Sequence, residues 1–259
     1  MDGMINRRDI ITSGVAAGAA LLSSSGKTMA YSNEERFWRE IETAFPASSG
    51  LVNMVNSGGG ACPKTTLDII SKYQKIAAAG GEDTSAELTS LKESGSSETI
   101  RQMMANAFGC RASEIALMRN AMEGLAIGLL GVDMKRGDEV LTTRGDYDSC
   151  IEIIRQREAR DGIHLKLVDI PMPAQDDDEI VAAFEEACTS RTRLILMCHM
   201  FNKNGQILPV RRISDMARRK GIMTIVDGAQ SIGHIDFEIS DLGCDVFAAS
   251  LHKWFYAPR

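Results

Sequence analysis

A lysine and a carboxylate each follow a short apolar run in the second half of the sequence. Asp227 comes directly after the run 221–226, and Lys253 comes shortly after the run 245–249. A lysine amine is a nucleophile only when it is deprotonated, so its pocket must lower its pKa or bind it as an imine. A carboxylate beside a pyridine nitrogen keeps that nitrogen protonated, so that the ring accepts electrons from a carbanion. The pair is the arrangement that a pyridoxal phosphate enzyme needs.

Each residue alone has a simpler interpretation. Asp227 could cap a turn, and Lys253 could be a solvated surface charge. A third polar residue, Asn202, follows another apolar run at 193–198. Because the three segments come in order at successive predicted strand ends, where ligands bind in open α/β sheets, we favour the functional interpretation.

The elements that would position these residues alternate along the chain. Apolar runs of strand length and helical periodicity predict strands at 139–142, 164–169, 193–198, 221–226 and 245–249, and helices at 122–131, 149–160, 176–188 and 209–220. Residues 34–108 are predicted to be mostly helical. Continuous apolar strands between amphipathic helices indicate an α/β fold with a mostly parallel sheet that helices cover on both faces.

Three of the predicted helices have an apolar side that should face the sheet. The predicted buried positions are Leu125, Leu129 and Leu130 in the first, Ile180, Val181, Phe184, Ala187 and Cys188 in the third, and Val210, Ile213, Met216 and Ala217 in the fourth.

The motifs VDGAQSIG at 226–233 and SLHKW at 250–254 resemble the class V aminotransferase family of fold-type I pyridoxal phosphate enzymes. The resemblance covers about residues 50–259 and implies the large domain of that fold. It also implies a role for each matching residue. Lys253 would form the internal aldimine, Asp227 would pair with the pyridine nitrogen, Gln230 and Asn202 would approach the phenolic oxygen, and Ser250 and His252 would hold the phosphate.

The resemblance extends to two further segments. RNAMEG at 119–124 matches the helix-opening turn that cradles the phosphate, where Ala121 and Met122 would supply backbone N–H groups. Many members carry threonine where this chain has Met122, which removes one hydroxyl donor. Tyr147 falls where the family stacks a side chain on the cofactor ring, and a half-buried loop aromatic is the alternative.

Within the family, LHKWFYAPR at 251–259 is most similar to the isopenicillin N epimerase-like group. We therefore expect an enzyme with epimerase or aminotransferase chemistry on a small-molecule amino acid, working as a homodimer. A lyase of the cysteine desulfurase or selenocysteine lyase type is the alternative, and a noncatalytic protein that keeps the fold is a second one.

Composition narrows the partners. The chain has 29 basic and 35 acidic residues and a net charge of −6, which disfavours nucleic acid as a partner. No apolar run reaches the roughly 20 residues of a membrane-spanning helix, so no stable membrane anchor is expected. Cys198 and His199 are adjacent and the other three histidines lie far apart, so we expect no metal site.

The first thirty residues differ from the rest. Arg7 and Arg8 precede a weakly apolar stretch at 10–22, and small residues follow at 28–30, which together predict a twin-arginine signal peptide. We expect an exported or periplasmic protein, with a cytoplasmic one as the alternative. Residues 31–259 would be the class V aminotransferase domain. Because family members continue well beyond the lysine, we expect the C-terminal small domain to be missing and this chain alone to be inactive or poorly soluble.

Overall fold

The computed structural model describes residues 33–46, 52–79 and 97–258, so the predicted signal peptide lies outside the described residues. The chain divides into two compact units. The first takes residues up to 107, 111–115 and 256–258, and the second takes 108–110 and 116–255. Among the described residues, no helix is long and apolar enough to cross a membrane.

The first unit is helical, as predicted. It contains α2 (Asn33–Ala44), α3 (Lys64–Ala79) and most of α5 (Ser97–Phe108). Neither α2 nor α3 has a buried residue, and Trp38 on α2 is 59% exposed. These helices therefore carry apolar side chains that the described chain does not cover.

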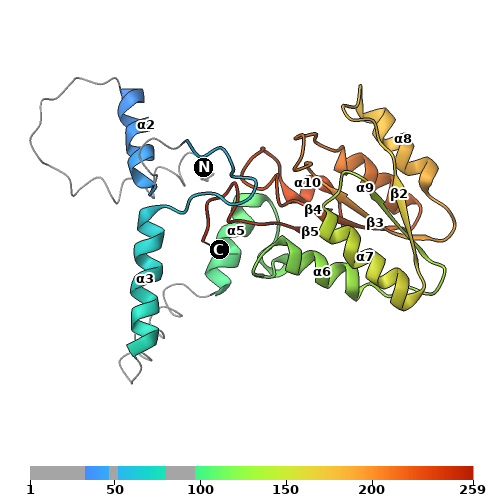
Figure 1. The fold of residues 1–259 in the computed structure, drawn as a ribbon, viewed down its shortest axis with the longest axis horizontal. Helices are drawn as coiled ribbons and strands as arrows, with labels where there is room; N and C mark the ends of the chain where they lie inside the picture. Colours follow the sequence, from blue (N-terminus) through green and yellow to red (C-terminus); the bar gives the residue numbers. More distant parts are fainter. Residues whose placement is uncertain (1–32, 47–51, 80–96, 259) are drawn as a thin grey trace, which may run out of the picture. The chain divides into compact units, whose positions relative to one another are not determined.

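The second unit is built on a parallel sheet of five strands (Figure 1). The strand order is β2-β1-β3-β4-β5, and every neighbouring pair is parallel. The strands are β1 (Glu139–Thr143), β2 (His164–Val168), β3 (Thr192–Cys198), β4 (Met223–Asp227) and β5 (Val246–Ala248). All five lie where the apolar runs predicted them, which confirms the α/β fold class.

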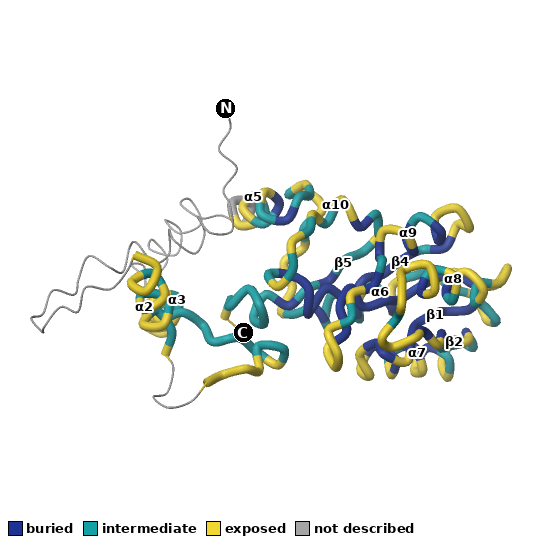
Figure 2. Tube along the Cα trace, turned by 90° about the horizontal axis from the view of Figure 1, so that it is seen from above, coloured by how far each residue is buried: buried dark blue, intermediate teal, exposed yellow. Residues whose placement is uncertain are grey.

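Helices cover both faces of this sheet. Buried side chains of α6 (Ala121–Gly131) and α7 (Asp148–Asp161) form one core cluster with β1, β3 and β4. Those of α8 (Asp177–Ala187), α9 (Val210–Arg219) and α10 (Ile239–Leu242) form the other. Figure 2 shows that burial is concentrated in the strands between these helices.

The predicted inner faces are confirmed with one exception. The four predicted positions of α9 are buried, and in α8 Ile180 and Phe184 are buried while the other three are partly so. Leu130 of α6 was predicted to be buried and is 40% exposed. It lies about 140° around the helix axis from Leu125, outside the stripe of Ala121, Leu125 and Leu129 that packs on the sheet.

Two glycines let α6 approach β4 and β5 closely. A Cβ on Gly128 would lie 3.0 Å from the Ile225 side chain, and one on Gly124 would lie 3.2 Å from Ala248. The first turn of α6 is thereby held beside the end of β5.

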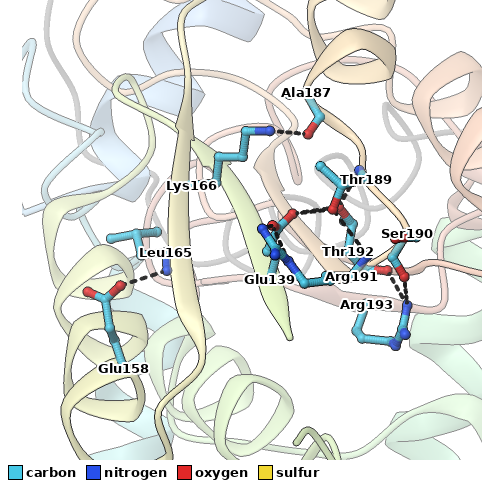
Figure 3. Close-up of polar contacts among 10 residues, drawn as sticks. All are labelled: Glu139, Glu158, Leu165, Lys166, Ala187, Thr189, Ser190, Arg191, Thr192 and Arg193. Carbon is cyan, nitrogen blue, oxygen red and sulfur yellow. Dashed lines mark hydrogen bonds and ion pairs between the residues drawn. The ribbon is translucent and has the colours of Figure 1, made fainter. Parts of the chain in front are cut away.

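A polar network lies near the end of the sheet where β1 and β3 begin (Figure 3). Glu139, which is 4% exposed at the start of β1, accepts hydrogen bonds from Arg191 at 2.7 Å and from Thr189 at 2.6 Å. Nearby, Lys166 of β2 donates to the Ala187 carbonyl at the end of α8. These contacts join the start of β1 to the segment before β3, and β2 to the end of α8. None of them uses a residue at the carboxyl end of a strand.

Candidate active site

The strand order places a topological switch point between β1 and β3, because the chain leaves β1 toward one side of the sheet and returns on the other. Ligands bind beyond the carboxyl ends of strands at such a point. Asp146 follows β1 there and is 1% exposed. Its carboxylate accepts hydrogen bonds from the backbone N–H of Cys198 at 2.5 Å and of Thr143 at 2.7 Å. Asp146 therefore links the ends of the two strands.

Asp227 ends β4 directly beside this point. It pairs in register with Cys198, is 7% exposed, and accepts a 2.9 Å hydrogen bond from the Ala229 N–H. Burial raises the pKa of Asp227 to about 6, and the negative charge of Asp146 acts in the same direction. The Ala229 hydrogen bond and the charge of Lys253 pull that pKa downward.

The residue after Asp227 packs closely against β5. A Cβ on Gly228 would lie 1.9 Å from the ring of Phe247 in β5. The Gly228 N–H donates to the Ala248 carbonyl at 2.8 Å. This close contact between β4 and β5 brings the turn after Asp227 next to the segment that carries the lysine.

Lys253 lies in the turn after β5 and is half-buried. Burial lowers the pKa of its amine, while the charge of Asp227 and the nearby Cys198 thiol act to raise it. The structure thus brings together the lysine and the carboxylate that the sequence paired. Each shifts the pKa of the other toward the charged form.

A candidate anion site lies at the first turn of α6. Asn120 caps the helix by accepting a 3.0 Å hydrogen bond from the Glu123 N–H. The backbone N–H of Ala121, the first residue of α6, donates to the buried Ser250 hydroxyl at 3.1 Å. A helix N-terminus with a hydroxyl beside it suits a phosphate group. The predicted phosphate residues Ala121 and Ser250 therefore meet.

Met122 contributes no hydroxyl to this turn. Its sulfur lies 3.7 Å from the Cys150 sulfur in the first turn of α7. The Met122 side chain is thus partly buried against α7, so only its backbone N–H is available for the role that the motif implies.

The other predicted residues are less closely tied to the pair. Tyr147 precedes α7 and is 42% exposed, and His252 is half-buried next to Lys253. Asn202 is exposed on the turn after β3, and its side chain makes no hydrogen bond to another described residue. Gln230 is buried, and its side-chain oxygen accepts a 2.7 Å hydrogen bond from the Trp254 indole. The cofactor contacts predicted for Tyr147, Asn202, Gln230 and His252 stay predictions.

Residue types alone missed two members of the site and the buried His199 beside it, whose backbone N–H donates to the Asp227 carbonyl at 2.9 Å. Asp146 is not among the predicted site residues, although its position shortly after the strand predicted at 139–142 could have identified it. Trp254 was noted only as part of a motif. His199 is 5% exposed, its Nδ1 has no hydrogen-bond partner among the described residues, and burial lowers its pKa to about 4.

The residues fit a bound pyridoxal phosphate. A buried acid with a raised pKa suits a pyridine nitrogen, a half-buried amine suits an aldehyde, and the α6 turn with Ser250 suits a phosphate. The acid and the amine follow the neighbouring strands β4 and β5, and the α6 turn contacts Ser250 after β5, all within one compact unit.

Comparison with known proteins agrees with this geometry. The family described as aminotransferase class-V matches residues 52–259. An isopenicillin N epimerase of Amycolatopsis lactamdurans is 30% identical over 227 residues, which cover 85% of this chain and 55% of that protein.

Two solved structures of C-DES have the same fold. A mutant with glycine covalently linked to the PLP cofactor aligns with a TM-score of 0.75 and 26% identity, over 84% of this chain and 57% of that one. The complex of the cystine C–S lyase C-DES with its reaction product cysteine persulfide aligns with a TM-score of 0.70 and 27% identity, over 78% and 54%. The chain spans little more than half the length of these relatives.

Proposed function

Because the chain belongs to the class V aminotransferase family, whose enzymes depend on pyridoxal phosphate, we propose that its site binds this cofactor through Lys253 and acts on an amino acid. The observation that carries the proposal is the electrostatically coupled pair of Asp227 and Lys253 beside the Ser250 hydroxyl and the first turn of α6. Epimerisation, as in the isopenicillin N epimerase relative, is the reaction that we favour, with aminotransfer as the related outcome.

When bound, pyridoxal phosphate supplies an aldehyde carbon and an electron-accepting ring. Lys253 would hold the aldehyde carbon, and Asp227 would hold a proton at the ring nitrogen. Burial keeps the pKa of the Lys253 amine below its ordinary value, so as a free amine it would accept a proton from the substrate α-carbon. Ser250 and the first N–H groups of α6 would bind the phosphate and fix the ring relative to both residues.

The visible absorption spectrum tests this assignment. Pyridoxal phosphate added to the purified chain should give a visible band, and Lys253→Ala should abolish it. Lys220→Ala is the matched control, since Lys220 is exposed on the far end of α9 and pairs with Glu185. A chain that gives no band would support the noncatalytic alternative, and a band that persists in Lys253→Ala would contradict the role of this lysine.

A C–S lyase reaction is the second candidate, and the fold shared with the cystine C–S lyase C-DES supports it. The two reactions differ in their products. A lyase would release pyruvate and ammonia, with sulfide from cysteine or cysteine persulfide from cystine, whereas an epimerase would invert an α-carbon and conserve the amino acid. Chiral chromatography and sulfide assays on one panel of amino acids, with Lys253→Ala as the blank, distinguish them.

We also propose that a chain as long as these relatives forms a homodimer. Family likeness supports this, as do the apolar side chains that α2 and α3 leave exposed. Sedimentation equilibrium measures the assembly directly. A full-length protein that stays monomeric at all concentrations would contradict the proposal.

Export by residues 1–30 is a further proposal, supported by the order of the arginine pair, the apolar stretch and the small residues. Cell fractionation should find the protein outside the cytoplasm. The double variant Arg7→Lys with Arg8→Lys should block export and retain the protein in the cytoplasm. Arg36→Lys, on the exposed surface of α2, is the control. Equal distribution of all variants would favour the cytoplasmic alternative.

A further inference from the structure

The segment after Asp227 and the segment after Lys253 are joined by one aromatic side chain. The Trp254 indole N–H donates to the Gln230 side-chain oxygen at 2.7 Å. The His234 ring stacks on the indole, with ring centroids 3.8 Å apart and an interplanar angle of 10°. His234 Nδ1 also lies 3.1 Å from the backbone carbonyl oxygen of Gln230. Trp254 is thus held from two sides by the segment that carries Gln230.

A glycine makes this approach possible. Gly233 has a φ of +73°, and a Cβ there would lie 3.0 Å from the Trp254 carbonyl oxygen and 3.1 Å from the Phe255 backbone. A side chain at position 233 would both strain the backbone and push the two segments apart. The two segments are therefore held together by backbone packing as well as by the side-chain contacts.

The hydrogen bond fixes which way the Gln230 amide faces. An indole N–H can only donate, so it requires the amide oxygen, and the opposite orientation would set an N–H group against another donor. With its oxygen held by Trp254, the Gln230 amide can present only N–H donors to its other neighbours. A donor is what an anionic phenolic oxygen on a cofactor ring requires.

We propose that Trp254 is a positioning residue, which orients Gln230 as a hydrogen-bond donor toward the ring oxygen of the cofactor. The inference rests on the proposed binding of pyridoxal phosphate through Lys253. Since Trp254 directly follows Lys253, the residue next to the covalent link would also set the hydrogen bond to the ring.

Trp254→Phe tests the proposal, because it keeps an aromatic ring for His234 and removes the N–H. A donor near the ring oxygen stabilises its negative charge, so losing that donor favours a proton on the lysine nitrogen. The pH midpoint of the Lys253-dependent visible band should therefore rise by about 0.5–1 unit. His234→Phe, which keeps the stacking but not the ring nitrogens, should leave the midpoint near its original value.

A double-mutant cycle separates orientation of Gln230 from a general structural effect. If Trp254 acts through Gln230, Trp254→Phe should add no further shift in a Gln230→Ala background. An unchanged midpoint in Trp254→Phe, or the same shift with and without Gln230, would overturn the proposal. Absence of any Lys253-dependent band in the unaltered chain would instead overturn the proposed function on which the inference rests.

Two measurements keep the test independent of how Trp254→Phe folds. The chain has two tryptophans, so benzothienylalanine incorporated in a Trp38→Phe background replaces only the Trp254 indole and removes only its N–H. It should reproduce the shift. In the cofactor-free protein, the Trp254 indole proton should exchange slowly with solvent and should lose that protection in Gln230→Ala. Fast exchange in the unaltered protein would contradict the hydrogen bond itself.

Discussion

The Ser250 hydroxyl accepts a hydrogen bond from the backbone N–H of Ala121, although 129 positions separate them in the chain. The contact joins the first turn of α6 to the turn after β5, which also carries Lys253. An N–H at the start of a helix has no partner within the helix, so a hydroxyl or an anion must satisfy it. The same groups that stabilise this junction can therefore bind a phosphate.

Ser250→Ala should weaken the binding of pyridoxal phosphate about tenfold, which corresponds to the loss of one hydrogen bond to a charged group. Titration monitored by the visible band measures the affinity. Ser214→Ala is the matched control, because Ser214 is buried in α9 and its hydroxyl has no hydrogen-bond partner among the described residues. Equal affinity in both variants would exclude Ser250 from the phosphate site.

Most of the fold could be predicted from the sequence because periodicity is a local property. A continuous apolar run such as 194–198 is typical of a strand with both faces buried, and α9 has its inner-face residues at regular spacing. The match to the class V family confirms the family and the cofactor that the two motifs predicted. Asp227 and Lys253 were found because the strand ends of a parallel sheet meet at one edge.

The rest depends on contacts between distant residues. Asp146 reads as an ordinary loop acid until the fold places it against the Cys198 N–H. Trp254 shows its partner Gln230 only once Gly233 lets two turns meet. The exposure of Leu130 depends on its angle around α6, which an apolar count along the sequence does not resolve.

Asp146→Asn should lower the free energy of unfolding by about 1–3 kcal/mol. Both carboxylate oxygens accept hydrogen bonds, one from Cys198 and the other from the Thr142 and Thr143 groups. An amide replaces one of these acceptors by a donor and leaves a buried N–H or O–H unpaired. Asp148→Asn, two positions on and exposed, should change the free energy by less than about 0.5 kcal/mol. Denaturant unfolding measures both, and similar losses would contradict the role of Asp146.

Gly228→Ala should destabilise the protein by about 1–3 kcal/mol through overpacking, because its Cβ would overlap the Phe247 ring. A smaller residue in β5 should relieve the overlap, so the double variant with Phe247→Leu should lose less than the sum of the single losses. Gly131→Ala is the control, since a Cβ there would meet no other described residue within 4 Å beyond its chain neighbours and its own helix backbone. Additive losses in the double variant would show that the contact with Phe247 is not the cause.

The buried Asp227 of the site and the buried His199 beside it should give opposite pH dependences of stability in the cofactor-free protein. The folded pKa of His199 is about 4, against 6.5 for a free histidine. Between these values the unfolded chain binds a proton that the folded chain excludes. The free energy of unfolding therefore falls as the pH falls from 6.5 to 4. The folded pKa of Asp227 is about 6, against 3.8, so between these values the folded chain keeps a proton and stability falls as the pH rises.

Each effect amounts to at most about 3 kcal/mol, so the two nearly cancel in the unaltered protein between pH 4 and 6. Single variants should separate them. Relative to the unaltered protein, His199→Gln should gain stability as the pH falls through this range, and Asp227→Asn should gain stability as the pH rises through it. Denaturant unfolding at each pH measures the differences, in which the other titrating groups cancel. If the stability of either variant relative to the unaltered protein is independent of pH, then that group titrates in the folded chain as it does in the unfolded one, and its burial does not control its protonation.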